Sequence, residues 1–158
     1  EYDVEAVWYN PNLYPPEEHA RRLAAMRAVA TALGVPLTVL EYDPQRWEEA
    51  CAQLWEEPEG GRRCQACFRL RLRRVAAYAA EGGVGLMATT LTVSPHKPAS
   101  AINPVGKAVA GEYGVSFLEA DFGKLGGFQR SVEMSRRWRL YRQRYCGCQP
   151  SLNARPKS

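Results

Sequence analysis

Leu86-Met87-Ala88-Thr89-Thr90-Leu91 is the stretch that decides the fold class of this chain. It is nearly all apolar or β-branched, which is typical of a strand buried on both faces of a parallel sheet. A loop at Pro95–Pro98 follows, and then we expect a helix over Ala99–Tyr113 and a further strand over Val115–Glu119. A strand, a helix and a strand in this order favour an α/β layer fold with a mainly parallel sheet.

The same alternation extends over the rest of the chain. Pro16 suits the first turn of a helix and Gly34 suits the cap after its last turn, so a helix is expected over Pro16–Leu33. We therefore predict one α/β domain over residues 1–152 and a flexible C-terminal tail over residues 153–158. The other expected elements are strands at Val4–Tyr9 and Leu37–Tyr42 and helices over Pro44–Trp55, from near Cys64 to Ala80, and from the Gly123–Gly127 loop to about Arg144.

Composition excludes several classes of protein. The chain has 158 residues, of which 46% are hydrophobic and 24% charged, as in ordinary soluble domains. No apolar run approaches the roughly 20 residues that cross a bilayer, so no membrane partner is expected. Five cysteines in a chain of this length indicate reduced thiols and a cytoplasmic location. One of them, Cys51, shares a predicted helical face with Trp47 and Trp55 and is expected to pack as a small hydrophobic residue.

Charge is distributed unevenly along the chain. Residues 122–158 contain nine Lys or Arg and one Glu, a net charge of +8, whereas residues 1–121 carry a net charge of −4. A basic end on an acidic body indicates a polyanionic partner, but a solvated helix face explains the same pattern. Aromatic residues between the arginines are compatible with base stacking or with a core stripe.

Two tight cysteine pairs carry the strongest chemical signal. Cys64 and Cys67 are expected near a helix start, where backbone N–H groups stabilise thiolates. Cys146 and Cys148 flank Gly147, which permits a sharp bend. The second pair is compatible with a small, easily reduced disulfide or with two thiolates directed at one metal. Two pairs about 80 residues apart suggest that the fold brings soft sulfur ligands together.

Polar loops provide candidate ligand-binding residues. In parallel sheets, ligands bind beyond the carboxyl ends of the strands, and the loops at Tyr9–Asn12, Thr89–Lys97 and Asp121–Lys124 are expected there. His96 is a candidate for proton transfer, although an ordinary loop with a surface histidine fits equally. The candidate substrate-binding residues are Asn10, Asn12, Thr90, Ser94, Lys97 and Arg142.

Taken together, five segments resemble the iron-dependent, non-cobalamin epoxyqueuosine reductases of queuosine biosynthesis. The resemblance extends from about Tyr9 to Ser151, and the order and joint presence of the segments are specific. The segments are Tyr9-Asn10-Pro11-Asn12, Arg63-Cys64-Gln65-Ala66-Cys67-Phe68, the stretch from Thr89 to Lys97, Asp121-Phe122, and the stretch from Tyr141 to Cys148.

This resemblance implies reduction of the epoxide of epoxyqueuosine, at the wobble position of tRNA, to the alkene of queuosine. It implies a Rossmann-like fold related to nucleotide α-hydrolases, and a [4Fe–4S] cluster with a possible additional iron. Cys64 and Cys67 match cluster ligands, while Cys146 and Cys148 match a pair that is either redox-active or part of the metal assembly. The implied partners are tRNA and an electron donor.

One departure from the family is expected to matter. The family opens with a strand that ends in a Cys-Cys pair, followed by a helix, and this chain starts after both elements. We therefore expect two further cysteine ligands upstream of residue 1, and a first strand and helix missing from the sheet. The alternatives are a zinc-containing RNA-binding protein with all four paired cysteines as ligands, and a thiol–disulfide oxidoreductase that uses Cys64 and Cys67.

Overall fold

The protein, described here by a computed structural model over residues 2–155, forms two compact units. Unit 1 consists of the residues up to Glu49 together with those from Ser135 onward, and unit 2 is Ala50–Met134. Each unit contains one pair of short parallel strands with helices, which confirms the predicted mixture of helices and parallel strands. No helix in the described range is long and apolar enough to cross a membrane. Residues 156–158 of the predicted tail lie outside the described residues.

Unit 1 is built on a strand–helix–strand segment. Strands β1 (Ala6–Trp8) and β2 (Leu37–Val39) pair in parallel, with Ala6 opposite Leu37 and Trp8 opposite Val39. The helix between them, α1 (Pro16–Leu33), has the predicted bounds because Gly34 adopts a left-handed φ of +65° and its N–H caps the last turn. The remaining helices that belong wholly or partly to unit 1 are α2 (Pro44–Cys51), α5 (Gly127–Arg137) and α6 (Gln149–Asn153).

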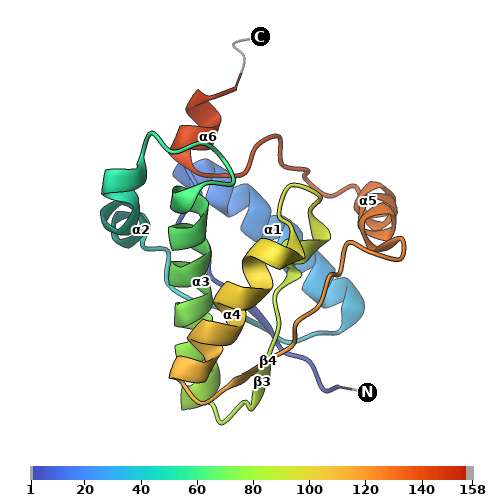
Figure 1. The fold of residues 1–158 in the computed structure, drawn as a ribbon. Coiled ribbons are helices and arrows are strands. Elements are labelled where there is room, and N and C mark those ends of the chain that lie inside the picture. The colour runs from blue at the N-terminus through green and yellow to red at the C-terminus, as the bar shows by residue number, and fades with distance from the viewer. Residues whose placement is uncertain (1, 156–158) are drawn as a thin grey trace. The chain divides into compact units, whose positions relative to one another are not determined.

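Unit 2 is organised around two long helices. Helices α3 (Arg62–Glu81) and α4 (Ala99–Glu112) lie side by side (Figure 1). Strands β3 (Leu86–Met87) and β4 (Ser116–Phe117) pair in parallel, and the short 3₁₀ helices are η1 (Ala52–Leu54) and η2 (Thr90–Val93). The hydrophobic core lies between these elements and consists of Phe68, Leu72, Ala76, Ala79, Met87, Ile102, Val109, Ala110 and Val115.

The strands are shorter than predicted, and the Rossmann-like single sheet is not confirmed. Among the described residues, the four strands form two two-stranded sheets, one in each unit. The predicted strand over Leu86–Leu91 is wrong beyond Met87. The Thr89 hydroxyl accepts a hydrogen bond from the Leu91 N–H at 3.3 Å and thereby starts the 3₁₀ turn of η2. A threonine side chain that competes for backbone groups in this way ends the strand.

Two predicted helix ends are also wrong. Helix α2 stops at Cys51, and η1 replaces its expected last turn. The predicted helix to Arg144 ends at Arg137, because Arg139 adopts a left-handed φ of +50°. The N–H groups of Arg139 and Leu140 then bond to the carbonyls of Arg136 and Ser135, which closes the helix end. Glycine normally marks such a cap, so its absence hid this end in the sequence.

Gly106 of α4 gives a test of core packing. A Cβ at this position would lie 2.3–2.7 Å from ring atoms of Phe117 in β4. We expect Gly106→Ala to lower the free energy of unfolding by about 1–3 kcal/mol, since an overpacked core forces neighbours to shift. Gly111→Ala on the same helix is the matched control, because nothing lies within 4 Å of its Cβ position. Urea unfolding followed by circular dichroism measures the free energy of unfolding of both variants. Equal stability of the two variants would contradict the close contact between Gly106 and Phe117.

Candidate functional site

The C-terminal cysteine pair lies in unit 1, on an irregular segment that leads into α6. Cys146 is half-buried, Cys148 is 5% exposed, and neither forms a disulfide. Gly147 between them has a φ of +129°, which favours glycine. The Ser151 hydroxyl donates to the Cys148 carbonyl at 2.9 Å and accepts from the Gly147 N–H at 3.4 Å. The bend that Gly147 was expected to allow is therefore present, and no disulfide closes it.

The loop after β1 contacts this cysteine segment. The Tyr14 N–H donates to the Gly147 carbonyl at 2.8 Å, and the Tyr145 hydroxyl donates to the Tyr14 carbonyl. Asn12 in the same loop is only 3% exposed, and its side-chain oxygen has no hydrogen-bond partner among the described residues. Asn10 is half-buried. The structure thus brings together the Tyr9–Asn12 loop and the C-terminal cysteine pair, two segments that the sequence singled out separately.

Helix α1 contributes a buried ion pair that sequence reasoning missed. The Arg22 Nε donates to a Glu18 carboxylate oxygen at 2.7 Å, and the Tyr141 hydroxyl donates to the other oxygen at 2.7 Å. Burial acts to raise the pKa of Glu18, but these hydrogen bonds and the arginine charges lower it below its ordinary value. As an acidic residue in the first turn of a helix, Glu18 would by itself be expected only to complement the helix dipole. The i,i+4 spacing of Glu18 and Arg22 is a local signal for their ion pair, whereas Tyr141 lies 123 residues away in the sequence and gave none.

His19, the next residue of α1, is also buried. It accepts a hydrogen bond from the Trp8 indole N–H at 3.0 Å and stacks on Tyr42 with ring centroids 4.1 Å apart. Burial lowers the pKa of His19, so the folded state holds the neutral imidazole. Its ring nitrogen is therefore available to the indole as an acceptor. This contact joins the helix to β1 and serves packing within unit 1.

The first cysteine pair lies in unit 2, in the first two turns of α3. Cys64 is half-buried and Cys67 is 8% exposed. The Gly60 N–H donates to the Cys64 sulfur at 3.2 Å. This hydrogen bond and the helix N-terminus both stabilise a thiolate, as predicted for a helix start.

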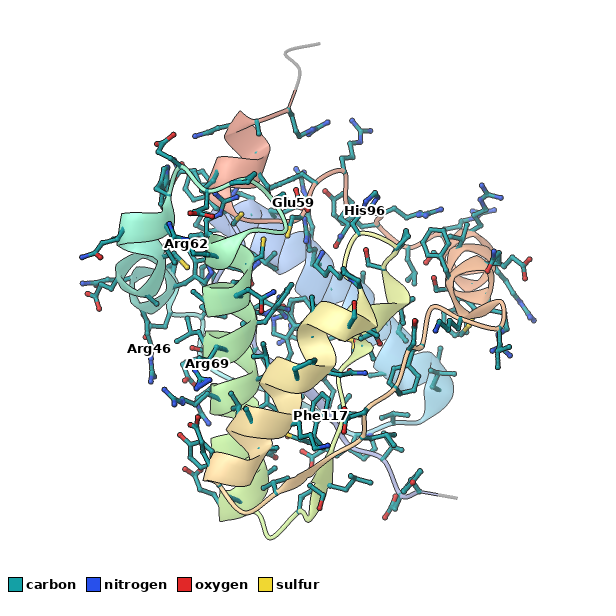
Figure 2. All side chains as sticks on the ribbon, viewed as in Figure 1. Arg46, Glu59, Arg62, Arg69, His96 and Phe117 are labelled. Carbon is teal, nitrogen blue, oxygen red and sulfur yellow. The ribbon has the colours of Figure 1, made fainter. Side chains whose placement is uncertain are left out.

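Three arginines close to this pair in the sequence, Arg62, Arg63 and Arg69, have partners other than the thiols. Arg62, at the start of α3, pairs with Glu57, and Arg69, farther along the same helix, pairs with Glu112 (Figure 2). Arg63 is 3% exposed, and its guanidinium donates to the Trp55 carbonyl at 2.7 Å and to the Glu57 carbonyl. It therefore fixes the loop that precedes the cysteine pair.

Cys51 is fully buried in unit 2, which agrees with its predicted packing role. Burial and then the neighbouring Cys67 raise the pKa of Cys51 to about 12, so its thiol stays protonated at neutral pH. Its sulfur lies 4.0 Å from the Arg63 carbonyl oxygen.

The hydroxyl-rich loop from Thr89 to Lys97 contacts a second predicted segment in unit 2. The Thr92 hydroxyl accepts the Phe122 N–H at 3.2 Å, and the Thr92 carbonyl accepts the Gly123 N–H at 3.1 Å. Lys97 is 8% exposed, whereas His96 is exposed on the loop before α4 (Figure 2). Of the remaining candidates, Ser94 is half-buried, and Thr90 and, in unit 1, Arg142 are exposed.

The first cysteine pair has the spacing and position of two metal-cluster ligands. Cys64 and Cys67 stand one helical turn apart and form no disulfide, which suits two ligands of an iron–sulfur cluster. Between residues 2 and 155, no group of three or more His, Cys, Asp or Glu side chains is arranged to hold a metal ion. The first pair therefore fits as part of a ligand set that other cysteines would complete.

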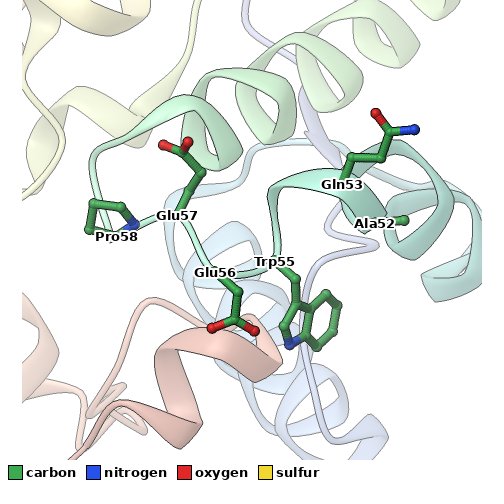
Figure 3. A pocket seen from close by; sticks show the side chains of 6 residues that line it. All are labelled: Ala52, Gln53, Trp55, Glu56, Glu57 and Pro58. Atoms are coloured by element: carbon green, nitrogen blue, oxygen red, sulfur yellow. The ribbon is translucent and has the colours of Figure 1, made fainter.

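A shallow cavity of about 450 Å³ lies in unit 2, between α2 and α3 in the sequence. Figure 3 shows Trp55 and Glu56 projecting to one side of this segment and Glu57 to the other. None of the predicted site residues lines it. The lining residues are Ala52, Gln53, Trp55, Glu56, Glu57 and Pro58.

Comparison with known proteins gives a consistent result. Residues 1–154 match a protein family described as epoxyqueuosine reductase QueH. The chain is 38% identical over 154 residues to the epoxyqueuosine reductase QueH of Staphylococcus epidermidis, covering 92% of this chain and 65% of that protein. It is 38% identical over 152 residues to that of Streptococcus pyogenes, covering 92% and 60%. The identity to the protein of Thermotoga maritima is 35% over 153 residues, covering 95% and 80%. The chain thus spans less than two thirds of the first two relatives.

The buried state of His19 predicts a pH dependence of stability. Its pKa is lowered on folding from an ordinary value of 6.5, so the unfolded chain binds more protons once the pH falls below that value. This effect of His19 leaves the free energy of unfolding unchanged above pH 6.5. Below pH 6.5 it lowers the free energy of unfolding, by up to about 1.4 kcal/mol at pH 5.5. We expect the fall in melting temperature from pH 7.5 to 5.5 to be smaller in His19→Gln. His96→Gln, which changes the exposed histidine, should keep the full fall, and equal slopes in all three proteins would contradict the assignment.

Proposed function

Because the chain belongs to the epoxyqueuosine reductase QueH family, we propose that it acts in the reduction of epoxyqueuosine in tRNA to queuosine. The family match over residues 1–154, which includes both cysteine pairs, is the observation that carries the proposal. A tRNA substrate places this activity in the cytoplasm.

The reaction sets requirements that the cysteines suit. Loss of the epoxide oxygen as water, with formation of the alkene, takes two electrons and two protons. A [4Fe–4S] cluster would pass electrons to the site when bound, and an additional iron would act as a Lewis acid on the epoxide oxygen. Cys64 and Cys67 would hold the cluster, since one thiol already accepts a backbone hydrogen bond at a helix start. Two further cysteine ligands are proposed upstream of residue 1.

Cys146 and Cys148 would act at the reaction centre. Oxidation of the two thiols to a disulfide releases two electrons and two protons, which equals what the epoxide consumes. An external electron donor would then reduce the disulfide. The pair forms no disulfide in the described structure, and a ring this small would contribute little to stability through unfolded-state entropy. A role in chemistry therefore explains the pair better than a role as a covalent staple.

Other side chains would bind the substrate. The buried Asn12 amide oxygen lacks a partner and is suited to accept a hydrogen bond from the nucleoside. Asn10, Thr90, Ser94 and Lys97 are proposed to contribute further polar contacts. His96 is proposed as the proton donor. Tyr145 suits that task less, because burial raises its pKa to about 12 and its hydroxyl is engaged by a backbone carbonyl.

The basic C-terminal region would hold the tRNA backbone. Residues 122–158 carry a net charge of +8, and α5 has no buried residue. Arg136, Arg137 and Arg139 are exposed at its end, and Arg142 is exposed farther along. Exposed cations in such a cluster neutralise phosphates without reading sequence.

The cluster assignment is testable by iron content. In a version that includes the expected upstream Cys-Cys segment, purified without oxygen, we expect about four irons and four sulfides per chain. Cys64→Ala should abolish both the cluster and the conversion of epoxyqueuosine to queuosine, read by mass spectrometry of digested tRNA.

Cys51→Ala is the control for that experiment, because this buried thiol should leave the iron content unchanged. Full iron in Cys64→Ala would remove this residue from the ligand set. A colourless protein with one zinc would instead support the zinc-containing RNA-binding alternative, and a colourless, metal-free protein with a titratable disulfide would support the oxidoreductase.

The tRNA interface is testable by salt dependence. Arg136→Gln, Arg137→Gln and Arg139→Gln together should weaken tRNA binding and reduce the slope of log affinity against log salt by up to about 3. The matched control replaces Arg62, Arg69 and Arg73 by Gln, which removes the same formal charge. These three arginines already have carboxylate partners, Glu57 and Glu112. Equal effects of the two triple variants, measured by filter binding, would mean that the tRNA does not dock on the end of α5.

A further inference from the structure

We propose that Arg22 is a positioning residue that holds the Cys146-Gly147-Cys148 segment against α1. In this arrangement the Cys146 thiol is accessible and the Cys148 thiol stays buried. The proposal rests on the proposed function of the cysteine pair, which it deepens by naming the side chain that sets the geometry of that pair.

The hydrogen bonds of the Arg22 guanidinium carry the inference. Nη1 donates to the Cys146 carbonyl at 2.8 Å and to the Gln143 side-chain oxygen at 2.9 Å, and Nη2 donates to the Tyr145 carbonyl at 3.0 Å. The guanidinium also lies 5.3 Å from the centre of the Tyr145 ring. One planar side chain from α1 thus binds three acceptors in the four residues that precede Gly147.

Glu18 fixes the orientation of that guanidinium. It is 4% exposed, and one of its oxygens accepts a hydrogen bond from Nε at 2.7 Å. Its second oxygen accepts the Tyr141 hydroxyl at 2.7 Å. The guanidinium is therefore held by the carboxylate at Nε and by two backbone carbonyls at Nη1 and Nη2, which leaves little freedom for the segment it binds.

Gly147 shows how closely the segment approaches α1. A Cβ at this position would lie 2.9 Å from the Arg22 Nη1 and 2.3 Å from a methyl carbon of Leu13. The φ of +129° also disfavours other residues. A glycine between the two cysteines is therefore required by contact with Arg22 and Leu13 as well as by the bend itself.

The consequence is an asymmetry between the two thiols. Cys146 is half-buried, whereas Cys148, beyond the glycine and at the start of α6, is 5% exposed. With Arg22 in place, an external reagent or substrate meets Cys146 first. Without it, the segment is free to leave α1 and both thiols become accessible.

Alkylation of the reduced, purified protein by iodoacetamide tests this directly. Rates at each cysteine are read by mass spectrometry of tryptic peptides. We expect Cys146 to react faster than Cys148 in the unchanged chain. In Arg22→Gln, Cys148 should react at least about tenfold faster than before, because several charge-assisted hydrogen bonds are lost. Arg22→Lys should behave like Arg22→Gln, since an ammonium keeps the charge but cannot span the same acceptors.

Arg27→Gln is the matched control, because Arg27 is an exposed arginine on the same helix. It should leave both alkylation rates unchanged. Unchanged rates in Arg22→Gln, or full rescue by Arg22→Lys, would overturn the proposal. If Arg22→Gln fails to fold, Gly147→Ala tests the same contact through the opposite partner and should expose Cys148 in the same way.

Turnover separates this inference from the proposed function. Cys146→Ser and Cys148→Ser should abolish reduction of epoxyqueuosine, while Arg22→Gln should lower kcat with little change in KM for tRNA. Full activity in the two cysteine variants would refute the role of the pair but would leave the alkylation result on Arg22 standing. Activity lost in the cysteine variants, together with unchanged alkylation in Arg22→Gln, would refute the positioning role alone.

Discussion

The ion pair between Glu18 and Arg22 is the interaction on which the C-terminal part of unit 1 depends. Both side chains leave water on folding, and a buried charge is tolerated only when it is paired and fully hydrogen-bonded. Here Tyr141, Gln143 and two backbone carbonyls supply further hydrogen bonds to the pair. Residues 141–146 have no regular secondary structure, so these contacts replace the backbone ladder that would otherwise order them.

The two cysteine pairs are held by different physical means. Cys64 and Cys67 stand on a regular helix, and α3 fixes their spacing whether or not a ligand is bound. Cys146 and Cys148 lie on a segment whose shape depends on side-chain contacts to α1 and on one glycine. A cysteine pair on a rigid helix suits permanent ligation of a cluster. A cysteine pair on an irregular segment, held by side-chain contacts, suits thiols that are oxidised and reduced in turn. This difference agrees with the separate roles proposed for them.

Local signals in the sequence were sufficient for some elements and not for others. Helix α1 was predictable because Pro16 and Gly34 mark its ends. The end of α5 was not, because arginine occupies the left-handed cap position where glycine is usual. The candidate cysteines and the Tyr9–Asn12 loop were predictable from residue type and resemblance. The role of Arg22 was missed because its partners in the C-terminal segment lie 121–124 residues away, and nothing in α1 signals them.

Arg22 reaches the segment largely through main-chain oxygens, and this has a consequence for how the protein tolerates mutation. The carbonyls of Tyr145 and Cys146 are present whatever side chains those positions carry. Substitution at residues 144–146 therefore leaves these two carbonyl contacts available, although a change at Tyr145 removes its ring from Arg22, while position 147 admits no side chain. The reactive groups can vary independently of the anchor, so new thiol chemistry can evolve at this site without loss of its architecture.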